Sequence, residues 1–299
     1  MQFPGISANR ELQLGLAPAN DDDAPLMSSA DAANGDGVLS CWSDEELFKP
    51  TPPRDECPIC LLTLPLDGKE VIYQECCGKI LCGGCFYEES TENNIRVLCP
   101  FCRFPEHNSG EEYIERFEKR AEGGDAEAIY YLGCFYDDGK CGLPRDQNKA
   151  VELWLRAGEL GCAEAYFNIG CAYFNGDGVE RDTKKAKHYY ELAAMGGDVT
   201  ARHNLGRFEE NAGNMDRAVK HWMISAAAGH DDSLEVIREC FVNGHATKDD
   251  FEKALRAHQA SKDEMKSDQR EAEIRRLQLH QKEREEEREE EREEATTTD

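Results

Sequence analysis

Eight of the fourteen cysteines in this 299-residue chain lie between positions 57 and 102, and their spacing constrains the fold more than any other feature. Three pairs have the form Cys-x2-Cys and one pair is adjacent: Cys57/Cys60, Cys76/Cys77, Cys82/Cys85 and Cys99/Cys102. The Cys-x2-Cys spacing lets two sulfurs on one tight turn reach the same zinc ion. Eight thiolates fill two tetrahedral sites and leave no position for water, so the sequence predicts two structural Zn²⁺ ions and no catalytic metal.

The composition of the chain limits the cellular compartments and the binding partners that we expect. No apolar run approaches the ~18 residues of a membrane span, and residues 1–16 lack the apolar core of a signal peptide. We therefore expect a cytoplasmic or nuclear protein, in which clustered cysteines bind metal in preference to forming disulfides. The formal net charge of -26 repels phosphate backbones and anionic lipids, so we expect neither nucleic acid nor a membrane as a partner.

The cysteine motifs resemble a RING finger of the all-cysteine kind. The resemblance covers about 50 residues and rests on Cys57-Pro58-Ile59-Cys60, Cys82-Gly83-Gly84-Cys85 and Cys99-Pro100-Phe101-Cys102-Arg103. No histidine lies between the first and last of these cysteines, which excludes the RING type with one histidine ligand. The resemblance implies interleaved ligands, with Cys57, Cys60, Cys82 and Cys85 on one zinc and Cys76, Cys77, Cys99 and Cys102 on the other.

The adjacent pair Cys76 and Cys77 departs from the RING pattern, which usually has at least one residue between these ligands. Adjacent side chains diverge on an extended chain, so both cysteines reach one zinc only if the backbone bends. Gly78 tolerates the dihedral angles of such a bend. In the alternative, one of the two cysteines binds and His107 or a water completes the second site.

The resemblance also implies a function. RING fingers bind a ubiquitin-conjugating enzyme and hold its charged ubiquitin in a reactive pose, with no catalytic nucleophile of their own. Ile59 and Pro100 stand where the family contacts the conjugating enzyme, and Arg103 stands where a basic residue bonds both that enzyme and ubiquitin. Each residue also has an ordinary structural interpretation, respectively as a core residue, a turn former and a surface charge.

A second pattern repeats itself after the finger. Gly133, Gly170 and Gly206 each close a similar nine-residue segment and recur at intervals of 37 and 36 residues. Each unit continues with a basic residue and alanine before an aromatic residue: Lys149-Ala150 before Trp154, Lys185-Ala186 before Tyr190 and Arg217-Ala218 before Trp222. Such units predict helix–turn–helix repeats that stack because one unit cannot bury its apolar face alone.

These units resemble Sel-1-like repeats, which are related to tetratricopeptide repeats and generally bind proteins. The resemblance is firm over about 125–230 and weaker up to 260, where a fourth unit is suggested by Ile237 and Ala254. The third unit is degraded, since Glu209 stands where the first two have Tyr136 and Tyr173. An inert spacer is the alternative to a binding scaffold.

The two ends of the chain are polar. Residues 1–53 are predicted to be a disordered tail, with either a fragment of helix capped by Ser43 or a short docking motif around Trp42 and Phe48. Residues 261–299 are predicted to be a charged tail, forming a solvated single helix or remaining disordered. A dimerising coiled coil is less favoured because the apolar heptads are not sustained.

The expected fold is therefore mostly α, with a small two-zinc RING finger at 54–105 and an all-α solenoid of helix–turn–helix repeats at 111–260. A disordered N-terminus and a charged C-terminal helix flank them. The expected function is a RING-type ubiquitin ligase that binds a conjugating enzyme and ubiquitin through Ile59, Pro100 and Arg103, with the repeats recruiting a protein substrate. The alternative is a zinc-stabilised adaptor without transferase activity.

Overall fold

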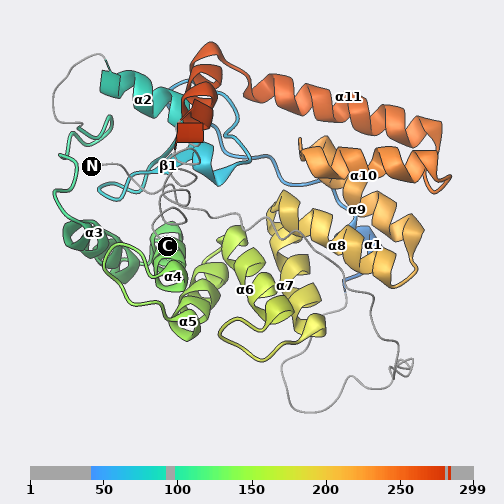
Figure 1. Ribbon diagram of the computed structural model, residues 1–299, viewed down its shortest axis with the longest axis horizontal. Helices are drawn as coiled ribbons and strands as arrows, with labels where there is room; N and C mark the ends of the chain where they lie inside the picture. The colour runs from blue at the N-terminus through green and yellow to red at the C-terminus, as the bar shows by residue number, and fades with distance from the viewer. Residues whose placement is uncertain (1–41, 92–97, 280–281, 284–299) are drawn as a thin grey trace, which may run out of the picture.

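The computed structural model describes residues 42–91, 98–279 and 282–283, and the chain is mostly helical (Figure 1). The shorter elements are α1 (Asp44–Leu47), the 3-10 helix η1 (Gly68–Glu70), β1 (Val71–Tyr73), β2 (Ile80–Cys82) and α2 (Gly83–Thr91). The longer helices are α3 (Gly110–Glu122), α4 (Ala126–Asp138), α5 (Gln147–Glu159), α6 (Ala163–Asn175), α7 (Thr183–Gly196), α8 (Val199–Asn211), α9 (Met215–Ala227), α10 (Asp231–Val242) and α11 (Lys248–Met265). Residues 268–279 form one more helix, called the C-terminal helix below.

Aspartates set the start of several repeat helices. The carboxylates that accept hydrogen bonds from first-turn N–H groups belong to Asp125, Asp146, Asp182 and Asp198, at the N-caps of α4, α5, α7 and α8. Such a cap satisfies donors that have no partner inside the helix. The helices then pair as α4 with α5, α6 with α7 and α8 with α9, which is the predicted solenoid of helix–turn–helix repeats.

The repeat glycines lie where two helices of a unit cross, as predicted. The three contacts are Gly133 against Trp154, Gly170 against Tyr190 and Gly206 against Trp222. A Cβ atom added to any of these glycines would lie within 2.6 Å of the facing ring. The fourth unit suggested by the sequence is also present, because α10 and α11 pack together and bury Ile237 and Ala254.

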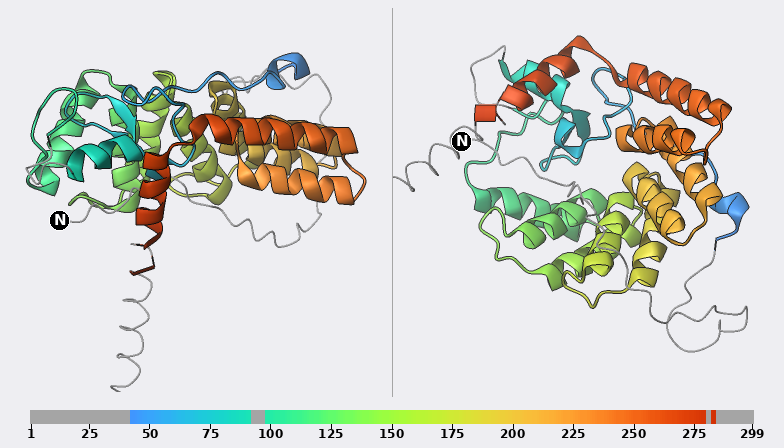
Figure 2. Two further views of the ribbon diagram at one scale, coloured as in Figure 1. Left: turned by 90° about the horizontal axis from the view of Figure 1, so that it is seen from above. Right: turned by 45° about the vertical axis from the view of Figure 1, so that its right-hand side comes forward.

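The cysteine-rich segment joins the two ends of the repeat array. Helices α3 to α11 follow one another along a curve, and the segment lies between α3 and α4 at one end and the C-terminal helix at the other (Figure 2). Its β1 and β2 form a small antiparallel hairpin in which Ile72 faces Leu81. Tyr73, at the end of β1, is buried in the same core as Phe117 and Tyr131. The repeat array and the cysteine-rich segment therefore form a closed circular arrangement, in which the segment lies between the two ends of the array.

Residues 42–53 differ from the disordered tail expected for 1–53. The helix capped by Ser43 is present as α1, and Leu47 at its end is only 2% exposed. It is buried because α1 packs against the third repeat, where the side chain of Arg202 donates to the Leu47 carbonyl. The expectation of disorder for 1–41 falls outside the described residues.

Residues 261–279 also differ from the solvated helix or disorder expected for the charged end. Residues up to Met265 complete α11, and the C-terminal helix then packs on the finger, with Arg270 and Glu273 buried. The charged composition of this segment did not predict the contact, because arginine and glutamate side chains are rarely buried unless they are paired. Among the described residues, no helix has the length and apolar character needed to cross a bilayer.

Candidate metal centre

The first cysteine group gathers side chains from two separate turns. Cys57 and Cys60 lie on the turn before β1, Cys82 is the last residue of β2, and Cys85 lies in the first turn of α2. Their four sulfurs all lie within 4.8 Å of one another, with 3.9 Å between those of Cys60 and Cys82. Strand and helix together therefore hold four sulfurs around one point.

The second group forms around the loop between β1 and β2. The N–H groups of Cys77 and Gly78 both donate to the Gln74 carbonyl, and Gly78 has a φ of 71°. This bend was predicted from the adjacent cysteines, and it directs both of their sulfurs into one group. The members of the group are Cys76, Cys77, Cys99 and Cys102, again within 4.8 Å of one another.

Two of the cysteine turns have the same backbone geometry. In the first, the N–H of Leu61 donates to the Cys57 carbonyl at 2.8 Å, and Leu61 has a φ of 60°. In the second, the N–H of Arg103 donates to the Cys99 carbonyl at 3.0 Å, and Arg103 has a φ of 59°. The shared Cys-Pro-x-Cys sequence thus builds two equivalent knuckles, called here the Cys57 knuckle and the Cys99 knuckle.

The donor set and its spacing fit zinc. A tetrahedron with zinc–sulfur bonds of 2.3 Å has sulfur–sulfur edges of about 3.8 Å. The sulfur–sulfur distances are 3.9 Å for Cys60–Cys82, 3.7 Å for Cys77–Cys99 and 3.4 Å for Cys76–Cys102. N–H groups of Cys60, Cys82 and Ile59 offset the effect of burial and lower the pKa of the Cys57 thiol to about 7, whereas burial raises the pKa values of Cys76, Cys77, Cys82 and Cys85. In each group, the four residues that would hold Zn²⁺ are therefore cysteines in a closed arrangement.

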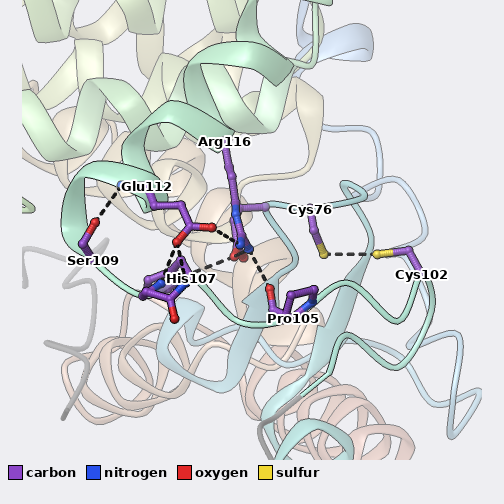
Figure 3. A network of polar contacts seen from close by, with 9 residues as sticks. Cys76, Cys102, Pro105, His107, Ser109, Glu112 and Arg116 are labelled. Atoms are coloured by element: carbon purple, nitrogen blue, oxygen red, sulfur yellow. Dashed lines mark hydrogen bonds and ion pairs between the residues drawn. The ribbon is translucent and has the colours of Figure 1, made fainter.

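His107 lies outside the second group. His107 lies in a polar network beside Arg116 (Figure 3), and its Nδ1 is 3.3 Å from a carboxylate oxygen of Glu75. Its ring packs on Tyr113. The same Glu75 oxygen accepts from Arg116 at 2.9 Å. The geometry favours both adjacent cysteines as ligands over the alternative in which His107 replaces one of them.

The predicted partner-binding residues sit on the two knuckles. Ile59 is 39% exposed on the Cys57 knuckle, while Pro100 is half-buried and Arg103 exposed on the Cys99 knuckle. Two further apolar side chains on these turns, Leu61 and Phe104, are also exposed, and the sequence analysis did not single them out. The sequence places both beside the cysteine motifs, because Leu61 directly follows Cys60 and Phe104 lies two residues after Cys102.

The finger contacts the first repeat through hydrogen bonds that were not predicted from the sequence. The Tyr73 hydroxyl donates to Asp125 at 3.0 Å and accepts from Arg120 at 2.8 Å. Arg116 of α3 also donates to the carbonyl of Pro105, just after the Cys99 knuckle (Figure 3). These residues carry no sequence signal for the contact, since Asp125 has the same capping role as the aspartates of other repeats.

A third group of potential ligands lies on the repeats and consists of Glu127, Cys162 and Glu164. The Cys162 thiol donates to Glu164 at 3.6 Å, and burial raises the pKa of the Glu127 carboxyl to about 7. A carboxyl with a raised pKa and a buried thiol both resist the ionised form that binds a cation, so we assign no metal site here.

Comparison with known proteins identifies the repeats. The Sel1 repeat family matches residues 126–162 and 163–198, so the chain contains Sel1 repeats. The ERAD-associated E3 ubiquitin-protein ligase component HRD3B of Arabidopsis thaliana is 31% identical over 112 residues, which are 37% of this chain and 17% of that protein. Chitin synthase regulatory factor 4 of Schizosaccharomyces pombe (strain 972 / ATCC 24843) is 29% identical over 123 residues, or 41% and 19% of the two chains. The match thus spans less than a fifth of either relative's length.

One solved structure extends the comparison. A Sel1 repeat protein from Oxalobacter formigenes is 27% identical, and the alignment covers 52% of this chain and 64% of that one with a TM-score of 0.46.

Proposed function

We propose that this chain is a zinc-stabilised protein-binding adaptor, in which the Sel1 repeats recruit a protein partner and the finger closes the repeat array. The supporting observation is that Tyr73 of the finger is buried in the core of the first repeat, against Phe117 and Tyr131. A finger built into the scaffold in this way holds the repeats in one curvature. A rigid curved surface favours protein binding because less conformational entropy is lost on association.

The relatives agree with this role. One is described as a component of a ubiquitin-protein ligase and the other as a regulatory factor of an enzyme. Both descriptions are of proteins that act together with another protein. An adaptor role for the present chain requires only the repeats and the zinc-stabilised fold.

A second candidate is the RING-type ubiquitin ligase, favoured by the exposure of Ile59 and Arg103. The contacts between the finger and the helices around it include those of Tyr73, Glu75 and the loop at 62–63, while Ile59 and Arg103 face solvent. A conjugating enzyme docked there would gain rate through orientation of its ubiquitin alone. In that case the partner recruited by the repeats would be the substrate.

The two candidates are separated by assaying the purified full chain for ubiquitin transfer with a broad panel of conjugating enzymes. The adaptor predicts transfer equal to a reaction without the chain, and stoichiometric capture of a cellular partner that does not depend on Ile59 or Arg103. Transfer above that background establishes the ligase. The absence of any stoichiometric partner, with either the wild-type chain or the Ile59→Ala/Arg103→Ala chain as bait, overturns the adaptor.

A further inference from the structure

The third repeat departs from the other two at three positions that lie together. Arg202 stands where the first two repeats have Ile129 and Tyr166, as judged from the closing glycines. Glu209 stands at the position of Tyr136 and Tyr173 in the first two repeats. His221 stands at the position of Leu153 and Tyr189. All three replacements are buried, at 1%, 2% and 0% exposure.

Burying polar groups costs free energy unless they are paired. Glu209 accepts from Lys187 and Asn214, both at 3.0 Å, and Arg202 donates to the Ala194 carbonyl at 2.9 Å, so these two residues are partly paired within the repeats. A different feature unites the three replacements. Their common feature is contact with α1 or with the residues that contact it. An Arg202 nitrogen donates to the Leu47 carbonyl, and the ring of Phe48 lies 4.8 Å from that of His221. Glu209 holds Arg217 at 3.2 Å, which in turn pairs with Asp44.

The segment that packs on this surface, called here the third-repeat site, has a definite chemistry. Asp44, Glu45 and Glu46 make the single turn of α1 acidic, and Leu47 and Phe48 follow as an apolar pair. The cations of Arg217 and Lys220 lie 5.1 and 5.2 Å from the centre of the Phe48 ring. The third-repeat site thus presents positive charge to an acidic turn and cation–π contacts to an aromatic ring.

Residues 43–48 leave some polar atoms of the third-repeat site unpaired. Within the described chain, the Nε atom of Arg202 and both ring nitrogens of His221 are buried without a hydrogen-bond partner. Burial lowers the pKa of His221 to about 3, so at neutral pH its ring offers one donor and one acceptor. A single helical turn is also unstable by itself, so α1 persists only through these contacts.

We propose that the third-repeat site recognises partner proteins through an acidic helical turn followed by leucine and an aromatic residue, and that residues 43–48 occupy it in cis until such a partner displaces them. The proposal rests on the adaptor function and specifies its recognition element. The apparent degradation of the third repeat is then a specialisation of its surface. A partner peptide gains access only by competing with a segment whose effective concentration is in the millimolar range, which confines binding to strong or multivalent partners.

The test measures binding of a fluorescent peptide of residues 41–50 to the full-length chain by anisotropy. Leu47→Asp/Phe48→Ala should undock the cis segment and bind the peptide at least about tenfold more tightly than the wild type. Asp44→Arg, which removes the ion pair with Arg217 and leaves the apolar pair intact, should act in the same direction. Asp44→Arg keeps the test decisive if Leu47→Asp/Phe48→Ala misfolds, as judged by circular dichroism.

A charge exchange provides the specificity control. Arg217→Glu in the undocked chain should abolish peptide binding, and a peptide with Asp44→Arg should restore it. Arg238→Glu, on the exposed face of α10, should leave binding unchanged. Undocked chains that bind no more tightly than the wild type, or a charge exchange without rescue, overturn the proposal.

Two other outcomes are informative. Dimers of the wild-type chain that dissociate when peptide is added would make the occupant a second copy and overturn the partner proposal. If the peptide test fails while cellular partners are still captured, the third-repeat site is rejected and the adaptor function stands. If the peptide binds as expected but no cellular partner is captured, the adaptor function alone is rejected.

Discussion

The guanidinium of Arg270 donates a hydrogen bond of 3.4 Å to the sulfur of Cys60, across 210 residues of sequence. It also donates to the carbonyls of Leu62 at 3.2 Å and Thr63 at 2.6 Å, on the same knuckle. Arg270 is 4% exposed, so its charge is largely removed from water. A zinc ion held by four thiolates would carry net negative charge, and the arginine would supply a compensating cation beside it.

Zinc removal is therefore expected to release the C-terminal helix from the finger. The full chain should contain two zinc ions, measured by elemental analysis, and a chelator should raise amide hydrogen exchange in residues 268–279. Helices α6 and α7, which are remote from both cysteine groups, serve as the internal reference. One zinc per chain contradicts the assignment of Cys76 and Cys77 together, and unchanged exchange in 268–279 contradicts the coupling.

Arg270→Met should weaken the finger without removing a metal ligand. The carbonyls of Leu62 and Thr63 lose their donor, which typically costs ~1–3 kcal/mol for a buried group. The measurements are thermal melting and the rate at which a chromogenic chelator takes zinc from the chain. Arg275→Met on the same helix is the matched control, because Arg275 is largely exposed. Equal zinc release from both variants would show that Arg270 does not support the site.

The helix crossings give a prediction about the repeats. Gly170→Leu places a side chain where even a Cβ would lie 2.6 Å from the Tyr190 ring, and overpacking of this kind typically costs ~1–3 kcal/mol. Gly133→Leu should act similarly against Trp154. Gly110→Ala is the control, because its added Cβ meets its nearest neighbour at 3.4 Å, an ordinary contact. A melting temperature unchanged by either leucine would contradict the close crossing.

The local features of this fold were predictable and the long-range ones were not. The bend at Gly78 and the helix crossings at Gly133 and Gly170 follow from short-range spacing, because one turn or one repeat unit determines each of them. The docking of Leu47 on Arg202 joins residues 155 apart, and no periodicity encodes such a contact. The contact of Arg270 with the finger was not predicted for a further reason, since Arg270 lies in a charged segment whose composition favours exposure to solvent.

The stability of the repeats should depend on pH through Asp198. Burial, together with the charge of Glu164, raises the pKa of its carboxyl from 3.8 to about 7. Between these values the folded state binds more protons than the unfolded state, so this residue's contribution to stability is lost as pH rises towards 7. Asp198→Asn keeps an N-cap acceptor for Ala201 and removes the titration.

The difference in unfolding free energy between Asp198→Asn and the wild type should therefore shift in favour of the variant from pH 5 to pH 8, measured by urea denaturation. Asp198→Ser, which also caps without titrating, should show the same trend. A difference that stays constant over this pH range would place the pKa of Asp198 near its ordinary value.

The last prediction separates the ligase from the adaptor at the level of single residues. If the chain transfers ubiquitin, Ile59→Ala should abolish transfer, because truncating an anchor at a small interface costs ~2 kcal/mol or more. Arg103→Ala should leave binding of the conjugating enzyme largely intact and slow discharge of its ubiquitin, because the guanidinium fork is suited to bridging two partners. Neither residue is a candidate zinc ligand, so zinc content and melting temperature should stay at wild-type values. Leu61→Ala is the matched control, since Leu61 occupies on the Cys57 knuckle the position that Arg103 occupies on the Cys99 knuckle. Transfer that survives both substitutions would mean that a ligase activity, if present, uses another surface of the finger.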